Sequence, residues 1–239
     1  MMTRSTFNLH SFAAMVIAIL LAQTYAHAQT SGRQAWFVAA SIPGDIENPI
    51  LVKTSNDLTQ VTLTTRAASS PVSIPSDGLV EVVREIENPD RPGEIAYHTL
   101  ARAAIPEDVR HAMVMLIPIR KESEYSLRFE VKVQDLAEFR GGGFMYLNLT
   151  NLNVAVQLGD ERMAMRPGQS RIANASNLET PVNKPISYHY FHPENEEWQL
   201  ISASTVALVP SRREICVFTW DSRYNRIRYH GISFPVGRR

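Results

Sequence analysis

Cysteine is almost missing from this sequence of 239 residues, which contains a single copy at Cys216. One cysteine excludes an internal disulfide, so the fold must be stabilised by packed apolar surface. Cys216 lies in the apolar run Ile215-Cys216-Val217-Phe218. This context predicts a small buried side chain rather than a reactive thiol.

Recognisable catalytic and metal-binding motifs are also missing. The sequence contains no Gly-x-Ser-x-Gly elbow, no His-Glu-x-x-His helix and no phosphate-binding loop of the Walker type. His189 and His192 are close together, but a spacing of three puts them on opposite faces of an extended strand. We therefore expect no metal site and no cofactor, and the sequence favours a protein that is not an enzyme.

Charge of one sign does not dominate the chain. Lysine and arginine total 24, aspartate and glutamate total 24, and the formal net charge is zero. A balanced chain has no global field that would recruit a polyanion, so nucleic acid is not an expected partner. After residue 28 no apolar run is long enough to span a bilayer as a helix.

The first 28 residues have the three parts of an export signal. These are the basic Arg4, the apolar run 12–22 and the small-residue site Ala26-His27-Ala28. The apolar run of about 11 residues is too short for a membrane anchor, which needs roughly 20. We expect cleavage after Ala28 and an exported chain that begins at Gln29, without stable membrane insertion. Together with the sparse cysteine, this predicts a bacterial protein of the periplasm or the extracellular space.

The rest of the sequence shows the pattern of a mainly β protein. Short alternating or apolar segments recur between turns rich in proline, glycine, asparagine and serine, and helical periodicity is nearly absent. The most we expect of helix is one or two turns over residues 105–110. The predicted strands cover 35–40, 60–66, 79–84, 112–119, 125–133, 144–149, 154–158, 162–165, 197–202, 214–220 and 226–232. We predict two tandem antiparallel β-sandwich modules of immunoglobulin-like type, residues 29–133 and 134–239.

The two halves of the sequence are weakly similar, which predicts a duplicated module. One landmark pairs the segment 58–63 with 149–156, and a second pairs 72–78 with 163–168. A third pairs a proline-led corner, an arginine and a buried strand at 104–116 with the same arrangement at 208–218. Chance similarity between β proteins is the alternative. The boundary is expected within 134–143, where three consecutive glycines form either a flexible joint or an irregular entry into a strand.

Two segments are candidates for recognition. The first is the aromatic segment 188–198, whose candidate binding residues are Tyr188, Tyr190, His192 and Trp198. The alternative is that these aromatics fill a core. The second is the basic C-terminal stretch, in which Arg226 and Arg228 share one strand face and are candidates for contact with an anionic polymer or partner. The alternative there is a charged edge strand that resists aggregation.

Three functions remain open from the sequence. The first is a non-enzymatic binding or assembly component of the bacterial cell envelope, whose partner is another envelope protein or a glycan. The second is a hydrolase acting on envelope polysaccharide or peptide, with dispersed catalytic residues such as His192, Glu194 and Asp221. The third is a structural subunit that assembles by strand addition.

Overall fold

The structure is a computed structural model that describes residues 32–175 and 178–236. The predicted signal peptide, residues 1–28, lies outside these ranges. All regular elements of the described residues are strands. Among them, no helix exists that could cross a membrane.

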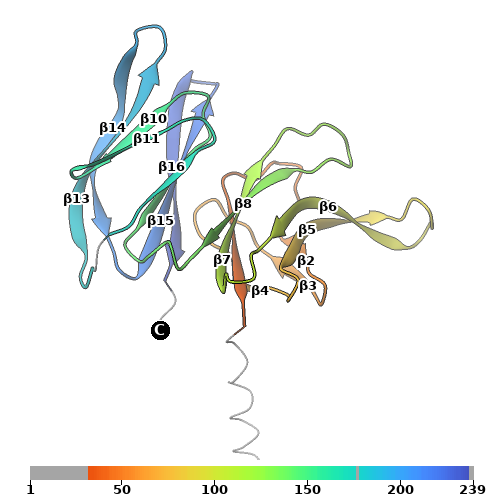
Figure 1. Cartoon of the computed structure of the whole chain (residues 1–239). Helices are drawn as coiled ribbons and strands as arrows, with labels where there is room; N and C mark the ends of the chain where they lie inside the picture. Colours follow the sequence, from red (N-terminus) through yellow and green to blue (C-terminus); the bar gives the residue numbers. More distant parts are fainter. Residues whose placement is uncertain (1–31, 176–177, 237–239) are drawn as a thin grey trace, which may run out of the picture. The chain divides into compact units, whose positions relative to one another are not determined.

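The first eight strands form two four-stranded sheets, with the orders β4-β1-β7-β8 and β3-β2-β5-β6 (Figure 1). Their bounds are β1 Gln34–Ala39, β2 Ile50–Lys53, β3 Leu58–Val61, β4 Val72–Ser73, β5 Leu79–Glu87, β6 Ile95–Ala104, β7 His111–Pro118 and β8 Phe129–Asp135. β8 therefore continues two residues beyond Val133, the expected end of the first module.

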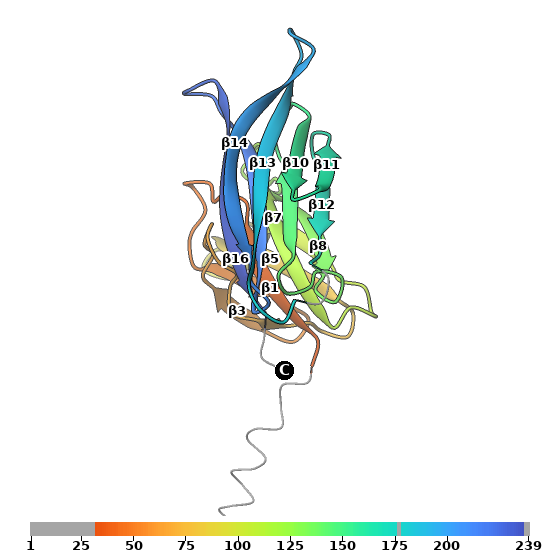
Figure 2. The same ribbon diagram turned by 90° about the vertical axis from the view of Figure 1, so that its left-hand side faces the viewer.

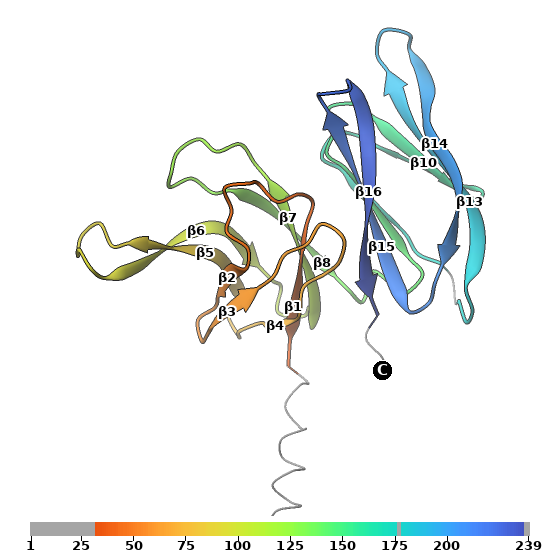
Figure 3. The ribbon, with the colours of Figure 1, turned by 180° about the vertical axis from the view of Figure 1, so that it is seen from behind.

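The last eight strands form two further sheets, with the orders β12-β9-β15-β16 and β11-β10-β13-β14. Figure 2 faces the second of these sheets, and Figure 3 shows β15 beside β16. Their bounds are β9 Phe144–Asn148, β10 Val154–Leu158, β11 Glu161–Met165, β12 Ser170–Ala173, β13 Val182–His192, β14 Glu197–Leu208, β15 Arg212–Asp221 and β16 Arg226–Pro235. Adding eight to each strand number of the first two sheets reproduces the strand orders of the second two.

The sheets are not purely antiparallel, which corrects one part of the predicted fold. β1 pairs with β7 in parallel, and β9 pairs with β15 in parallel. All other ladders between strands are antiparallel. Parallel pairing requires a long connection between partners, and strand alternation alone does not reveal it.

Alternation along two central strands produces three apolar clusters. On β7, Val114 and Leu116 face a cluster of the first eight strands, whereas Met113 and Met115 face the opposite side. On β15, Phe218 faces a cluster of the last eight strands. The third cluster joins Met113 and Met115 to residues of β15 and β16. β7 and β15 are thus buried on both faces, which explains their continuous apolar sequences.

The three glycines between β8 and β9 are packed closely, which argues against the flexible joint. A Cβ atom on Gly141 would overlap the carbonyl oxygen of Pro210, and Gly142 has a φ of +77°. The backbone N–H of Gly142 donates to the carbonyl of Arg212 at 2.8 Å. Gly143 closes a turn on Arg140 and enters β9. The segment is a tight entry into a strand.

The sequence landmarks for a repeat agree only in part with the strand orders. The third landmark falls on the end of β6 with β7 and on the end of β14 with β15, which occupy equivalent places. The first landmark pairs β3 with β10, and the second pairs β4 with β11. By the strand orders, however, β3 is equivalent to β11 and β4 is equivalent to β12. Residues 105–110 contain a turn and no helix.

Candidate functional site

A groove lies between the two sheets formed by the last eight strands. It encloses about 470 Å³ and takes residues from β13 and β14 on one side and from β15, β16 and their connecting turn on the other. Its lining consists of Tyr190, Leu200, Ile201, Ser202, Trp220, Asn225, Arg226, Ile227, Arg228 and Tyr229. We call this set the aromatic groove. It brings together three predicted residues, Tyr190, Arg226 and Arg228, which come from two separate candidate segments.

The aromatic groove exposes large apolar side chains. Leu200 is 59% exposed, Tyr229 is 41% exposed and Trp220 is 40% exposed. Such side chains bury substantial apolar area when a partner covers them, and the indole and phenol groups can also hydrogen-bond. The groove therefore has the chemistry of a recognition site.

Hydrogen bonds and ring contacts hold the tyrosines of the groove in place. The Tyr229 hydroxyl lies 2.9 Å from the Ser202 hydroxyl, and the Tyr190 hydroxyl donates to the side-chain carbonyl of Gln199 at 2.5 Å. The Tyr229 ring also packs on Tyr188, with 4.6 Å between ring centroids. Tyr188 itself is buried in the core, so it supports the groove from below rather than lining it.

Positive charge gathers at one end of the groove. Arg228 pairs with Asp221 at 3.3 Å, and the same carboxylate accepts the backbone N–H of Arg223. Arg226 lies 5.2 Å from the centre of the Tyr224 ring. Within the described ranges no carboxylate is in ion-pair range of Arg226. Its guanidinium is therefore available to bind an anionic group, which it can do with two parallel hydrogen bonds.

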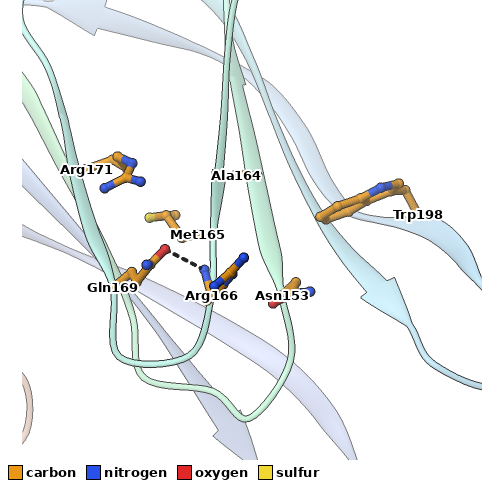
Figure 4. Close-up of a pocket in the computed structure, with 7 residues that line it drawn as sticks. All are labelled: Asn153, Ala164, Met165, Arg166, Gln169, Arg171 and Trp198. Atoms are coloured by element: carbon orange, nitrogen blue, oxygen red, sulfur yellow. Dashed lines mark hydrogen bonds between the residues drawn. The ribbon is translucent and has the colours of Figure 1, made fainter.

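Trp198 lines a second, smaller pocket of about 300 Å³ (Figure 4). The close-up shows Arg166, Gln169 and Arg171 around the turn between β11 and β12, with Trp198 to one side. The backbone N–H of Arg166 donates to the Gln169 side chain at 3.0 Å. Arg162 lies 5.9 Å from the Trp198 ring. We call the residues that line this second pocket the arginine pocket. Trp198 lines the arginine pocket and does not line the aromatic groove.

The residues considered for hydrolysis have other neighbours in the structure. Asp221 is occupied by Arg228 and the backbone of Arg223, while the His192 ring lies beside Tyr190 at 6.1 Å. Nδ1 of His192 is buried without a partner. No hydrogen bond among the described residues joins His192, Glu194 and Asp221. The same part of the chain contains no group of three or more metal-ligating side chains.

Sequence analysis missed Leu200, Trp220 and Tyr229 as groove residues. Trp220 and Tyr229 had been assigned to strands as ordinary alternating positions, and Leu200 to a strand expected to end at Ser202. The only sequence signal was that Tyr229 and Trp220 lie next to Arg228 and Asp221. No known family model matches the chain, and none of the curated proteins matches it, so the function must be argued from the groove itself.

Proposed function

We propose that this chain is an exported, non-enzymatic binding protein of the bacterial cell envelope and that the aromatic groove is its binding site. The observation that carries the proposal is the meeting of Trp220, Tyr229 and Arg226 in one groove, with no carboxylate of the described residues in ion-pair range of Arg226. Export rests on the signal pattern in the first 28 residues. Binding, rather than catalysis, rests on the arrangement of polar groups described above.

The fold supports this proposal if the two halves are sandwich modules of one duplicated type. The repeated strand order and the equivalent parallel pairs favour duplication. Loops and edges of β-sandwiches are common places for recognition, while the sheets hold them in position. In this arrangement the first immunoglobulin-like module is a support and the second carries the site.

The groove favours a ligand that offers carboxylates next to an apolar or ring-shaped surface. Arg226 and Arg228 would bind the carboxylates, while Trp220 and Tyr229 would cover the apolar surface. Envelope proteins with acidic segments and acidic glycans both provide these groups. Structural assembly by strand addition is a special case of the same proposal.

Tryptophan fluorescence tests the proposal, because Trp220 is one of only three tryptophans. The purified protein is titrated with oligogalacturonate and with an acidic peptide. We expect at least one of them to change the fluorescence, and the Arg226→Glu variant to bind it at least tenfold more weakly. Arg171→Glu in the arginine pocket carries the same charge change and should bind like the wild type.

Two results would contradict the proposal. Loss of binding in Arg171→Glu but not in Arg226→Glu would place the site in the arginine pocket. Steady release of cleavage products from either probe would point to the hydrolase alternative.

A further inference from the structure

Strand β14 has an unusually bare edge. It pairs with β13, and in the described part of the chain with no other strand. Residues 198–208 contain no charged side chain and no proline. Proteins normally protect long edge strands with charge, proline or a covering segment, because an open row of N–H and C=O groups accepts other strands.

The equivalent edge of the first eight strands is closed. There the backbone N–H of Arg128, just before β8, donates to the carbonyl of Leu100 on β6 at 2.7 Å. β6 also carries Arg102. Between β14 and β16, by contrast, the hydroxyl groups of Tyr229 and Ser202 meet at 2.9 Å, and no backbone hydrogen bond joins these two strands within the described residues. The edge of β14 therefore lacks backbone pairing with β16, whereas the equivalent edge of β6 has a backbone hydrogen bond to the segment just before β8.

The backbone groups of Thr205 point toward this open side. The carbonyl of Pro185 on β13 accepts the N–H of Gly159 after β10, so Pro185 faces away from β14. Thr205 is the register partner of Pro185. In an antiparallel ladder both members of such a pair turn their N–H and C=O away from each other. Thr205 therefore directs both groups toward the free edge, where its N–H is open and its carbonyl oxygen lies 3.4 Å from the Ser204 hydroxyl, and its side chain is exposed.

We propose that β14 accepts an extended, acidic segment of a partner polypeptide as an added strand. This inference rests on the proposed function of the aromatic groove. An added strand would lie about 4.8 Å from β14, as neighbouring strands of a sheet do, and would replace the hydroxyl contact between Ser202 of β14 and Tyr229 of β16. The segment is acidic because Arg226 and Arg228 line the β16 side beside Leu200 and Ser202 of β14. Backbone hydrogen bonds supply affinity, and the arginines select the charge.

The experiment uses three soluble probes with the purified protein. The first is a blocked eight-residue peptide of alternating valine and glutamate. The second is the same peptide with a methyl group on every backbone nitrogen, which keeps the carboxylates but removes the backbone donors from both edges of the strand. The third is oligogalacturonate. Binding is followed by tryptophan fluorescence, and amide hydrogen exchange is measured across residues 197–208.

We expect the first peptide to bind and to slow amide exchange in β14 at least tenfold at saturation. The N-methylated peptide should bind at least tenfold more weakly. Thr205→Pro removes an outward N–H without breaking the ladder to β13, and should weaken binding to the same extent, whereas Thr205→Ala should not. The probe series tests the inference even if Thr205→Pro fails to fold.

Other outcomes overturn the inference separately from the proposed function. If oligogalacturonate binds and the peptide does not, or if both peptides bind equally, the groove is a binding site but β14 is not a strand acceptor. A dimer that forms without peptide and persists with it would identify a second copy as the occupant. If no probe changes the fluorescence or the exchange, the proposed function fails as well.

Discussion

At the scale of single residues, Cys216 combines burial with a hydrogen bond to Tyr188. Burial raises the pKa of the Cys216 thiol to about 12, and the contact with Tyr188 partly offsets this effect. Because burial penalises the charged thiolate, the reactive form is scarce at neutral and mildly alkaline pH. The sequence prediction of a buried cysteine is confirmed.

We predict that an aromatic disulfide reagent at pH 8 labels native Cys216 on the order of a thousandfold more slowly than the unfolded chain. The rate should rise with pH toward 12 for as long as the protein stays folded. Absorbance of the released thiol in buffer and in urea measures this ratio. A Ser222→Cys variant provides an exposed control in the turn after β15, and equal rates at the two sites would contradict the prediction.

Sequence patterns identified some groove residues and misplaced others, for a physical reason. Arg226 and Arg228 were found because charge marks solvent-exposed positions. Tyr188 was predicted to bind but lies in the core, and Trp220 lies in the groove although its strand looked ordinary. Whether an aromatic on an alternating strand is covered depends on its place in the sheet, which the local sequence does not specify.

At the scale of elements, long apolar strands were predictable and strands with breakers were not. β10 was predicted with its observed bounds and β7 within one residue. β13 is not among the predicted strands, although His189 and His192 were expected on an extended segment, and Pro185 argues against a central strand. The structure tolerates this proline because Pro185 lies opposite Gly159, which is one residue beyond the end of β10. At that position no backbone N–H of β13 is needed to pair with β10.

The glycine entry into β9 yields a prediction for stability. Gly141→Ala should lower the free energy of unfolding by about 1–3 kcal/mol, because its Cβ would overlap the Pro210 carbonyl and the backbone must move. Gly44→Ala is the matched control, since a Cβ there meets nothing within 4 Å. Urea denaturation measures both variants. A Gly141→Ala protein as stable as Gly44→Ala would show that the segment is the flexible joint after all.

At the scale of the whole molecule, side chains from both halves share one apolar cluster, and a buried arginine ties β15 to the segment between β8 and β9. Ile215, Val217 and Ile232 pack with residues of β1 and β7. Arg213 donates to the carbonyls of Phe139, Leu136 and Pro235, and its guanidinium lies 5.6 Å from the centre of the Phe234 ring. The first eight strands and the last eight strands each have an apolar cluster of their own, and this third cluster joins them.

We therefore predict that residues 34–236 unfold in a single cooperative transition. Ile215→Ala should lower the stability by about 2–5 kcal/mol and shift the whole transition, because it leaves a cavity in the shared cluster. Calorimetry and near-ultraviolet circular dichroism would measure the transition by two probes. Two separate transitions, with Ile215→Ala affecting only one, would contradict the prediction.

The parallel pairs β1 with β7 and β9 with β15 also constrain the order of events during biogenesis. Gln34 pairs with His111, so β1 cannot pair with its neighbour β7 until more than seventy further residues have emerged. Closing so long a loop is entropically unfavourable and slows folding. If the chain is exported from its N-terminus, only Gln34 and Ala35 of β1 can pair early, with β4, and the rest of β1 waits for β7 until about half of the chain has crossed. A chaperone that binds unfolded chains would protect β1 during this interval.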